Sequence, residues 1–558
     1  MITGEGGAGT RVDAPDDTDD TDAASAGRTL LEGLLSRPWG QVSPSIYETG
    51  RLVALAPWLA GHGRRVRYLM ESQRADGMWG APDGYALVPT LSAVDALSSV
   101  LLAGRPVGPR GGEADIAGAA AALARVLPGL AGYLRRLPAA AVPDMPAGDL
   151  IAGSLVESIN TRLGALAASA GPGLAPSALG ARLALPAGMD ASRLGKVRAA
   201  LAAGVTLPEK VLHALEVADG LARGARSVRP ASTGAVGASP AATAAWLDER
   251  TARDPRHPAR VFLETVVSDH DGLAPCGIPI TVFERAWVLS FLARAGLAAR
   301  VPAPLVDALD AALGPVGTPA AEGLPADADT TAATLYALGL LGFPRPPDVL
   351  WTYETGTHFC TWPGEEGFSV TVNAHVLEAF GLYLRAVERG EAPRTAAAPR
   401  YAATVAKLVT LICERQEADG SWTDRWHASP YYATMCCALA LGHFGGPEAA
   451  GALRRARTWV RETQRADGSW GRWSGTPEET AYAIHILLSG EPGTETVQET
   501  KRYEESVASG RKFLPRPDQL VNGHIDGPAL WHDKDLYAPS VIIRAAVLAA
   551  HRLANPRL

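Results

Sequence analysis

The heptapeptide Q-R-A-D-G-S-W, Gln464 to Trp470, is the most informative stretch for predicting the fold, because close copies of it occur at two other places in the chain. Gln416 to Trp422 reads Q-E-A-D-G-S-W and Gln73 to Trp79 reads Q-R-A-D-G-M-W. Each copy follows an amphipathic stretch, and its Asp-Gly pair predicts a turn. Gln416 and Gln464 lie 48 residues apart, about the length of a helical hairpin with its loops. A repeat of that period predicts an array of helical pairs.

A second set of predicted helices is richer in small and apolar residues than the helices before the heptapeptides, and most of its members end at a glycine. The set comprises residues 91–102, 331–341, 373–382, 433–441 and 480–488. Paired helices of unequal polarity predict two concentric layers with the more apolar layer inside. We therefore predict an all-α protein built from (α/α) barrels. The Gln and Trp of each heptapeptide are expected to tie a helix end to the next hairpin, which is a structural role.

Composition narrows the class of protein. The 558 residues carry a formal charge of -7, so no basic field for nucleic acid is expected. The five cysteines show no C-x-x-C spacing, which fits a reducing compartment. We find no signal peptide and no uncharged apolar run of about eighteen residues, so a cytoplasmic protein without integral membrane association is expected. Residues 1–27 are expected to form a disordered tail. The tail contains Asp16, Asp17 and Asp20 as D-D-x-x-D, but a flexible segment offers no apolar pocket beside that pattern.

The stretch P-A-D-A-D-T-T-A-A-T-L-Y-A-L, Pro325 to Leu338, is the chemically distinctive part of the chain. It places Asp327, Asp329 and Thr330 directly before a helix that enters a core. An aspartate at this position is also an ordinary helix cap. Burial and a second carboxylate nearby both raise the pKa of a carboxyl group, and a group raised in this way can serve as an acid at neutral pH. The stretch therefore favours a site that delivers a proton.

Several motifs together resemble the class II terpene cyclases of bacterial type. Besides the heptapeptides and the D-x-D stretch they are S-P-S-I-Y-E-T-G from Ser43, P-I-T-V-F-E-R-A-W from Pro279, S-V-T-V-N-A-H-V-L from Ser369, D-R-W-H-A-S-P-Y-Y-A-T from Asp424, E-E-T-A-Y-A from Glu478 and L-W-H-D-K-D-L-Y from Leu530. The resemblance implies two α-barrel domains with the active site between them. On that basis residues 28–60 with 290–558 form a β domain, and residues 61–289 form an inserted γ domain.

The family resemblance also implies a reaction, in which a buried acid protonates a prenyl diphosphate and the diphosphate is retained. By motif position Asp329 is the proton donor and Asp327 its partner. The usual motif is D-x-D-D, and here Thr330 stands in place of the last Asp. The D-x-D-T-T variant is similar to that of bacterial drimenyl diphosphate synthases, so cyclisation of farnesyl diphosphate to bicyclic drimenyl diphosphate is our first expectation. A twenty-carbon cyclase that makes a copalyl- or halimadienyl-type diphosphate is the alternative.

Further site residues are predicted from the same motifs. Aromatic faces can stabilise a carbocation, and a neutral imidazole or an amide can orient water or take the final proton. The predicted wall is Trp426, Tyr431 and Trp362, and the predicted polar residues are His427 and Asn373, with His375 as a comparable candidate. Lys534 and Arg425 are expected to anchor the diphosphate. The family's Mg²⁺ site implies Asp149 and Asp144 as ligands, since Mg²⁺ needs few protein ligands when phosphate oxygens share its coordination.

Functions of other classes stay open at this point. A non-catalytic helical toroid for binding would show the same repeats. A protein prenyltransferase β-subunit shares the barrel but needs a zinc site of Asp, Cys and His, and no such trio is evident. A membrane-bound triterpene cyclase would carry more of the heptapeptides. The oligomeric state is not predicted.

Overall fold

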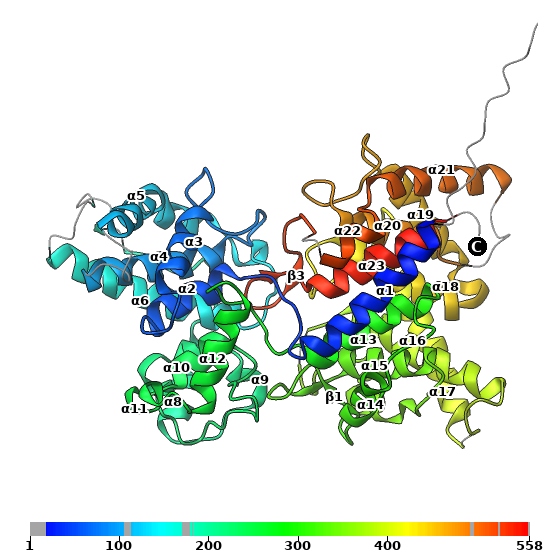
Figure 1. Ribbon diagram of the computed structural model, residues 1–558, viewed down its shortest axis with the longest axis horizontal. Coiled ribbons are helices and arrows are strands. Elements are labelled where there is room, and N and C mark those ends of the chain that lie inside the picture. The colour runs from blue at the N-terminus through cyan, green and yellow to red at the C-terminus, as the bar shows by residue number, and fades with distance from the viewer. Residues whose placement is uncertain are drawn as a thin grey trace, which may run out of the picture.

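A computed structural model describes residues 18–104, 113–169, 174, 179–180, 182–365, 367–394, 396–490, 496–522 and 525–555. The chain forms two helical bodies that lie side by side (Figure 1). Each body has its own apolar core. The all-α prediction of two helical barrels is confirmed.

The larger body, which we call the β domain, contains the first helix and the C-terminal half of the chain. Its elements are α1 (Thr18–Ser36), α13 (Thr281–Arg294), α14 (Ala303–Ala312), β1 (Thr318–Pro319), β2 (Ala326–Asp327), α15 (Ala328–Leu340), η3 (Pro347–Tyr353), α16 (Val370–Glu388), α17 (Ala398–Glu414), α18 (Pro430–Phe444), η4 (Gly446–Ala449), α19 (Ala450–Glu462), α20 (Pro477–Leu487), α21 (Val497–Phe513), α22 (Pro517–Asn522), β3 (Trp531–His532), β4 (Leu536–Tyr537) and α23 (Ser540–Leu553). Helices α13, α15, α16, α18, α20 and α23 contact one another in that order, and α23 returns to α13. These helices form a closed inner ring, with α14, α17, α19, α21, α22 and α1 outside it.

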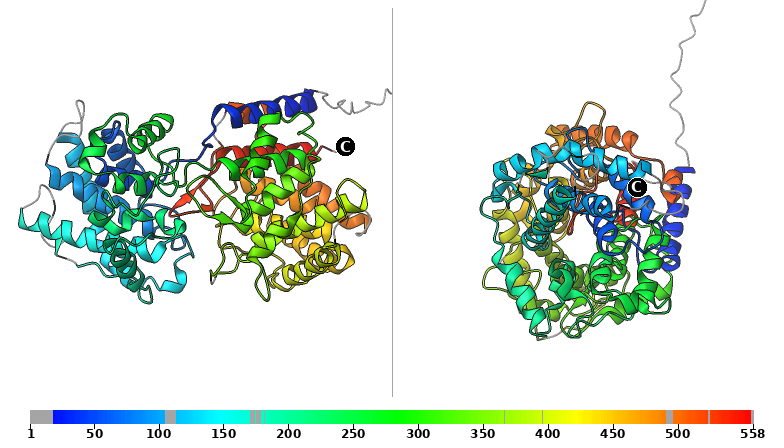
Figure 2. Two further views of the ribbon diagram at one scale, coloured as in Figure 1. Left: turned by 90° about the horizontal axis from the view of Figure 1, so that it is seen from below. Right: turned by 90° about the vertical axis from the view of Figure 1, so that its left-hand side faces the viewer.

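The smaller body, the γ domain, is inserted between α1 and α13. Its elements are α2 (Ile46–Leu55), α3 (His62–Glu71), α4 (Leu87–Ala103), α5 (Glu113–Arg136), η1 (Ala139–Ala141), α6 (Gly148–Ala168), α8 (Ser192–Ala202), α9 (Glu209–Leu212), η2 (Leu215–Ala222), α10 (Pro240–Trp246), α11 (Glu249–Arg253) and α12 (Pro258–Asp269). Its inner ring runs from α2 through α4, α6, η2 and α10 back to α2. The right-hand view of Figure 2 looks onto this ring.

The three heptapeptides have the structural role predicted for them. Each tryptophan is fully buried, and its indole N–H donates to a carbonyl of the preceding helix, at Leu69, Ile412 and Val460. Each glutamine Nε2 donates to the carbonyl of its own turn and to the carbonyl of a helix in the next hairpin, at Ala122, Ala452 and Ser506. The turn glycine has a positive φ in all three copies, which a side chain rarely adopts. The heptapeptide therefore joins one helical pair to the next.

The domain boundaries differ from the predicted ones by fifteen residues at the start of the insertion (46 against 61) and by nine at its end (281 against 290). Helix α2 packs against α4 in the γ domain, although residues up to 60 had been assigned to the β domain. Helix α13 packs in the β-domain ring from Thr281, although that domain was expected to resume at 290. The prediction of a disordered tail over 1–27 is wrong for its last part, because α1 packs against α22 and α23 with Ala23 and Ala26 buried. Asp16 and Asp17 lie outside the described residues.

The chain crosses between the two bodies from α1 to α2 and again from α12 to α13, and the hairpin β3–β4 also reaches across. Val42 pairs with Pro539, and Pro44 pairs with Pro275. The short hairpin β3–β4 leaves the β domain and reaches the γ domain, as the left-hand view of Figure 2 shows.

Within the described residues one segment, Asp115–Arg136, is long and apolar enough to cross a membrane, and its helix α5 packs against α3 and α4. The absence of integral membrane association therefore stays a prediction.

Candidate active site

An open cavity lies where the two domains meet. The β domain contributes the D-x-D stretch and most of the aromatic side chains, and the γ domain contributes Pro146, Lys210 and His213. Asp327, Asp329, Thr330, Trp362 and Trp426 line this cavity, so five of the predicted site residues are brought together.

Asp327 caps α15, the helix of the inner ring that carries the acid stretch. Its Oδ1 accepts from the backbone N–H of Thr330 at 2.6 Å, and its Oδ2 is 2.9 Å from the hydroxyl of the same residue. The hydroxyl of Thr331 donates to the carbonyl of Asp327 and accepts from the N–H of Thr318, which fixes the helix start on the β1–β2 pair. Burial, and then the neighbouring carboxylate of Asp329, raise the pKa of Asp327 to about 8. A protonated Asp327 donates to the Thr330 hydroxyl instead of accepting from it.

Asp329 lies in the first turn of α15 and contacts α16. Its Oδ1 is 2.7 Å from Nδ1 of His375, and its Oδ2 makes no hydrogen bond to any described residue. Burial lowers the pKa of His375, but the Asp329 carboxylate outweighs burial and raises that pKa well above its usual value. The Asp329 side chain is 18% exposed, so its second oxygen faces the cavity. The arrangement is a pair of carboxyl groups that binds at least one proton at neutral pH, with an imidazolium beside it.

Aromatic rings form much of the β-domain wall. Phe283, Tyr432 and Trp531 line the cavity, and the ring centroids of Tyr432 and Trp531 are 4.6 Å apart. Trp362 and Trp426 meet edge to face at 5.5 Å. The indole Nε1 of each of these last two residues is buried without a hydrogen-bond partner in the structure.

The γ domain contributes positive charge. Lys210 is exposed at the cavity, on the short helix α9. The two ring nitrogens of His213 face only acceptors, the carbonyl of Gly237 at 2.6 Å and the Asp533 carboxylate at 2.8 Å. Both nitrogens must then carry a proton, so His213 is an imidazolium. Burial raises the pKa of Asp533, but His213 and Lys534 outweigh it and hold that pKa at about 2. No sequence motif marked Lys210 or His213.

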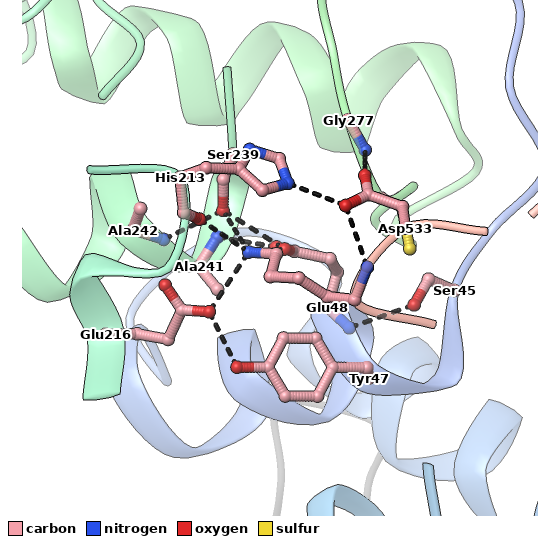
Figure 3. Close-up of polar contacts among 12 residues, drawn as sticks. Ser45, Tyr47, Glu48, His213, Glu216, Ser239, Ala241, Ala242, Gly277 and Asp533 are labelled. Carbon is pink, nitrogen blue, oxygen red and sulfur yellow. Dashed lines mark hydrogen bonds and ion pairs between the residues drawn. The ribbon is translucent and has the colours of Figure 1, made fainter. Parts of the chain in front are cut away.

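Lys534 does not line the cavity, which contradicts its predicted role as a diphosphate anchor. It sits at the tip of the β3–β4 hairpin, fully buried in the γ domain, where its ammonium group forms ion pairs with Glu48 and Glu216. It also donates to the hydroxyl of Ser239 at 2.7 Å. Figure 3 shows this cluster, in which Glu216 also accepts from Tyr47. Every proton of the ammonium group has a protein partner, so the residue joins the two domains.

Three other predicted residues lie behind the cavity wall. Tyr431 packs against Trp459, and its neighbour Tyr432 lines the cavity instead, because adjacent residues of a helix point about 100° apart. His427 is buried behind Tyr432 at a ring distance of 4.6 Å. Asn373 is buried, and its amide bonds the backbone of Phe359 and Ser369, which ties a loop to α16. The predicted catalytic roles of His427 and Asn373 therefore do not fit the structure.

Arg425 also binds protein groups at the domain interface. Its guanidinium forms ion pairs with Glu365 at 3.1 Å and with Asp144 of the γ domain at 3.0 Å, and it lies over the ring of Trp426. Asp144, predicted as a magnesium ligand, is thus paired with an arginine. Burial raises the pKa of Asp149, and the carboxylates of Asp190 and Asp144 raise it further against the effect of Arg193. Among the described residues no group of three or more His, Cys, Asp or Glu is placed to hold a metal. These oxygens suit Mg²⁺ only if phosphate oxygens complete its coordination.

Comparison with known proteins decides the family. The model of the squalene-hopene cyclase C-terminal domain matches residues 373–489. An ent-copalyl diphosphate synthase of Streptomyces sp. (strain KO-3988) is 40% identical over 539 residues, covering 95% of this chain and 97% of that one. The labda-7,13-dienyl diphosphate synthase of Streptomyces clavuligerus is 42% identical over 544 residues, covering 96% and 94%. The chain belongs to the class II terpene cyclases. The solved ent-copalyl diphosphate synthase from Streptomyces platensis superposes with a TM-score of 0.84 at 43% identity, covering 95% of this cyclase and 99% of that chain.

The family assignment confirms the predicted enzyme class and removes the non-catalytic toroid and the protein prenyltransferase as readings of this cyclase. The farnesyl and drimenyl specialisation is not supported by these relatives, whose names are those of copalyl and labdadienyl diphosphate synthases. Sequence reasoning preferred Tyr431 to its neighbour Tyr432 and missed Trp531, although both Tyr432 and Trp531 stand in motifs that it had identified. It missed Lys210 and His213 because no local pattern distinguishes them from surface residues.

Proposed function

We propose that this cyclase converts geranylgeranyl diphosphate into a bicyclic diphosphate of copalyl type. The observation that carries the proposal is the carboxyl pair Asp327 and Asp329, which opens onto an aromatic cavity between two barrels. The relatives at 40–42% identity support the twenty-carbon substrate, because their names specify twenty-carbon products. The reaction is an isomerisation: one proton is added to the terminal double bond, two rings form, one proton is lost, and the diphosphate stays attached.

Asp329 is the proposed donor, since its Oδ2 faces the cavity whereas both oxygens of Asp327 are engaged by Thr330. Asp327, with its pKa near 8, holds a proton at neutral pH, and we propose that it passes this proton to the Asp329 carboxylate, which then gives it to the double bond. His375 balances the negative charge that Asp329 acquires after the transfer. The acid therefore works as a unit of three side chains from α15 and α16.

The cation that results needs walls that attract positive charge and that do not add to it as nucleophiles. Phe283, Tyr432 and Trp531 supply such walls, and each contact between a cation and a ring contributes about 0.5–2 kcal/mol. The hydroxyl of Tyr432 accepts from the indole of Trp287 at 2.9 Å, which holds that ring in place. The aromatic layer thus lies on the same domain as the acid.

The diphosphate is proposed to bind near Lys210 and the His213 imidazolium, the cations that the γ domain places at the cavity. Asp149 and Asp144 would hold Mg²⁺ there together with phosphate oxygens, and the ion would neutralise charge on the diphosphate. This assignment replaces Lys534 with Lys210.

A second candidate is the fifteen-carbon substrate, farnesyl diphosphate. Thr330 favours it, because the D-x-D-T-T stretch resembles that of drimenyl diphosphate synthases. The test is incubation of the purified cyclase with each diphosphate and Mg²⁺, then phosphatase treatment and mass spectrometry of the alcohols. A bicyclic twenty-carbon alcohol is expected. A product from the fifteen-carbon substrate alone would replace the first proposal with the second, and no cyclic product from either would end both.

A further inference from the structure

Glu478 is a buried carboxylate behind the aromatic wall. It lies in the first turn of α20, where the helix N-terminus favours an anion. Three donors converge on its Oε1: the indole N–H of Trp531 at 2.8 Å, the hydroxyl of Tyr482 at 3.0 Å and Nε2 of His427 at 3.3 Å. Three donors on one oxygen stabilise the ionised form. The side chain is 5% exposed.

No positive charge offsets this carboxylate. Nδ1 of His427 accepts from the backbone N–H of Ser429 at 3.0 Å, so the ring proton is on Nε2 and the imidazole is neutral. Within the part of the chain that the structure describes, no lysine or arginine comes within ion-pair distance of Glu478. The buried carboxylates Glu48 and Glu216 differ in this respect, because both have such a partner in Lys534. Glu478 is thus a negative charge that faces only neutral groups.

The strongest of its hydrogen bonds leads to the cavity. Trp531 lines the cavity, and its N–H points back to Glu478. A carboxylate that accepts from an indole N–H increases the electron density of the ring, and a more electron-rich ring attracts a cation more strongly. The rings of Tyr482 and His427 lie behind Trp531 and surround the same Glu478 oxygen.

We propose that Glu478 is a positioning residue that stabilises the carbocation through Trp531. The inference rests on the proposed function, because it needs a cation in the cavity. In this proposal the buried Glu478 carboxylate supplies the negative charge that balances the cation while the rings form. Glu478 touches no substrate, and Trp531 is the group that does.

The neighbouring residue supplies a matched control. Glu479 is also buried on α20 and also accepts three hydrogen bonds, from the hydroxyls of Ser429 and Thr476 and the backbone N–H of Arg472. None of these donors lines the cavity. The variants Glu478→Gln and Glu479→Gln therefore remove the same charge from the same helix, and only the first removes it from behind Trp531.

The first measurement is turnover with the substrate that the wild-type cyclase accepts. Glu478→Gln is expected to lower kcat about 10- to 100-fold with little change in KM, and to release monocyclic or hydroxylated products from incompletely cyclised cations. Glu479→Gln is expected to change kcat less than about threefold at a similar melting temperature. In the Trp531→Phe background, Glu478→Gln should have less than about a threefold further effect. Equal losses in the two glutamine variants, or an undiminished effect of Glu478→Gln in that background, would overturn the proposal.

The second measurement does not need turnover or a folded Trp531→Phe variant. A prenyl diphosphate with a protonated amine at a ring-forming carbon mimics the cation, and the all-carbon diphosphate is its neutral counterpart. Calorimetry should show that Glu478→Gln weakens binding of the amine at least about tenfold while binding of the neutral compound changes less than about twofold. Equal weakening of both would overturn the proposal. If the wild-type enzyme cyclises neither diphosphate, the proposed function fails instead, so the two failures are distinct.

Discussion

Replacing Lys534 with methionine tests whether this residue joins the domains or binds the substrate. Methionine keeps a long apolar side chain and removes only the ammonium group. In the structure that group is fully buried and is shared by the carboxylates of Glu48 and Glu216. Removal of one partner from a buried ion pair typically costs about 3–5 kcal/mol, because the other partner is left as an unpaired charge.

Two features of the cluster set where in this range the loss should fall. Both carboxylates lose the same ammonium partner, which favours the upper half. The N–H of Ala241 and the hydroxyl of Tyr47 still donate to them at 2.6 Å, which limits the loss. We therefore expect about 4 kcal/mol, roughly a thousandfold in the folding equilibrium. Burial already raises the pKa of Glu48 against the effect of Lys534. Without Lys534 the cluster takes up protons more readily on folding, so the loss should be greater at pH 8 than at pH 6.

The assay is urea denaturation followed by circular dichroism at 25 °C, alongside steady-state kinetics. Glu48→Gln is the control for charge, because one ammonium then faces one carboxylate and the cost should be smaller. If Lys534→Met unfolds at the wild-type urea concentration and only its KM for the diphosphate rises, the residue binds substrate and our account of the interface is wrong.

Further predictions concern the acid and the diphosphate. Asp329→Asn should lower kcat at least about a thousandfold, since the side chain keeps its shape but can no longer transfer a proton; because His375 also loses its carboxylate partner, some loss of melting temperature is expected. Near wild-type turnover would refute Asp329 as donor. The pKa of Asp327 is raised to about 8 in the folded enzyme, so its proton is lost as pH rises through 8. Turnover should fall on that limb, and a pH–rate profile of Asp327→Asn with an identical limb would assign the limb to another group. Lys210→Met should raise KM about tenfold, or about 1.4 kcal/mol, without altering stability, and an unchanged KM would remove it from the diphosphate site.

The parts of the fold that depend on local pattern could be predicted from the sequence. Four of the apolar segments chosen by their spacing became α15, α16, α18 and α20 of the inner ring. The heptapeptide could be read because its glutamine, glycine and tryptophan act within one turn and the adjoining helices. Asp327 and Asp329 could be found because a carboxyl pair at a helix start is visible within five residues. These features need no knowledge of which segments meet in space.

The errors have a different origin. The motif around Lys534 was identified correctly, and so was the motif that contains Tyr47 and Glu48, but nothing in either shows that they face each other across 486 residues. A lysine near a predicted anion site and a lysine in a buried ion pair have the same local sequence. Tyr431 and Tyr432 differ by one position on α18, and a shift of about 100° decides which of them lines the cavity. Which of two adjacent side chains faces the cavity depends on how the helix packs against its neighbours, and the local sequence does not show this.

The hairpin β3–β4 both lines the cavity and joins the two domains, and the sequence alone does not show that one segment does both. Its first strand supplies Trp531 to the cation wall, and its tip supplies Asp533 to His213 and Lys534 to the buried cluster of the γ domain. One short hairpin therefore holds the domains together through Asp533 and Lys534 and forms part of the cavity through Trp531 and Asp533. Since residues of both domains line that cavity, its length depends on how the hairpin seats the domains against each other. For the proposed prenyl diphosphate substrate, we therefore expect the interface to set the preference between fifteen- and twenty-carbon chains, and competition between the two diphosphates should show that substitutions at the hairpin tip change this preference before they affect the acid.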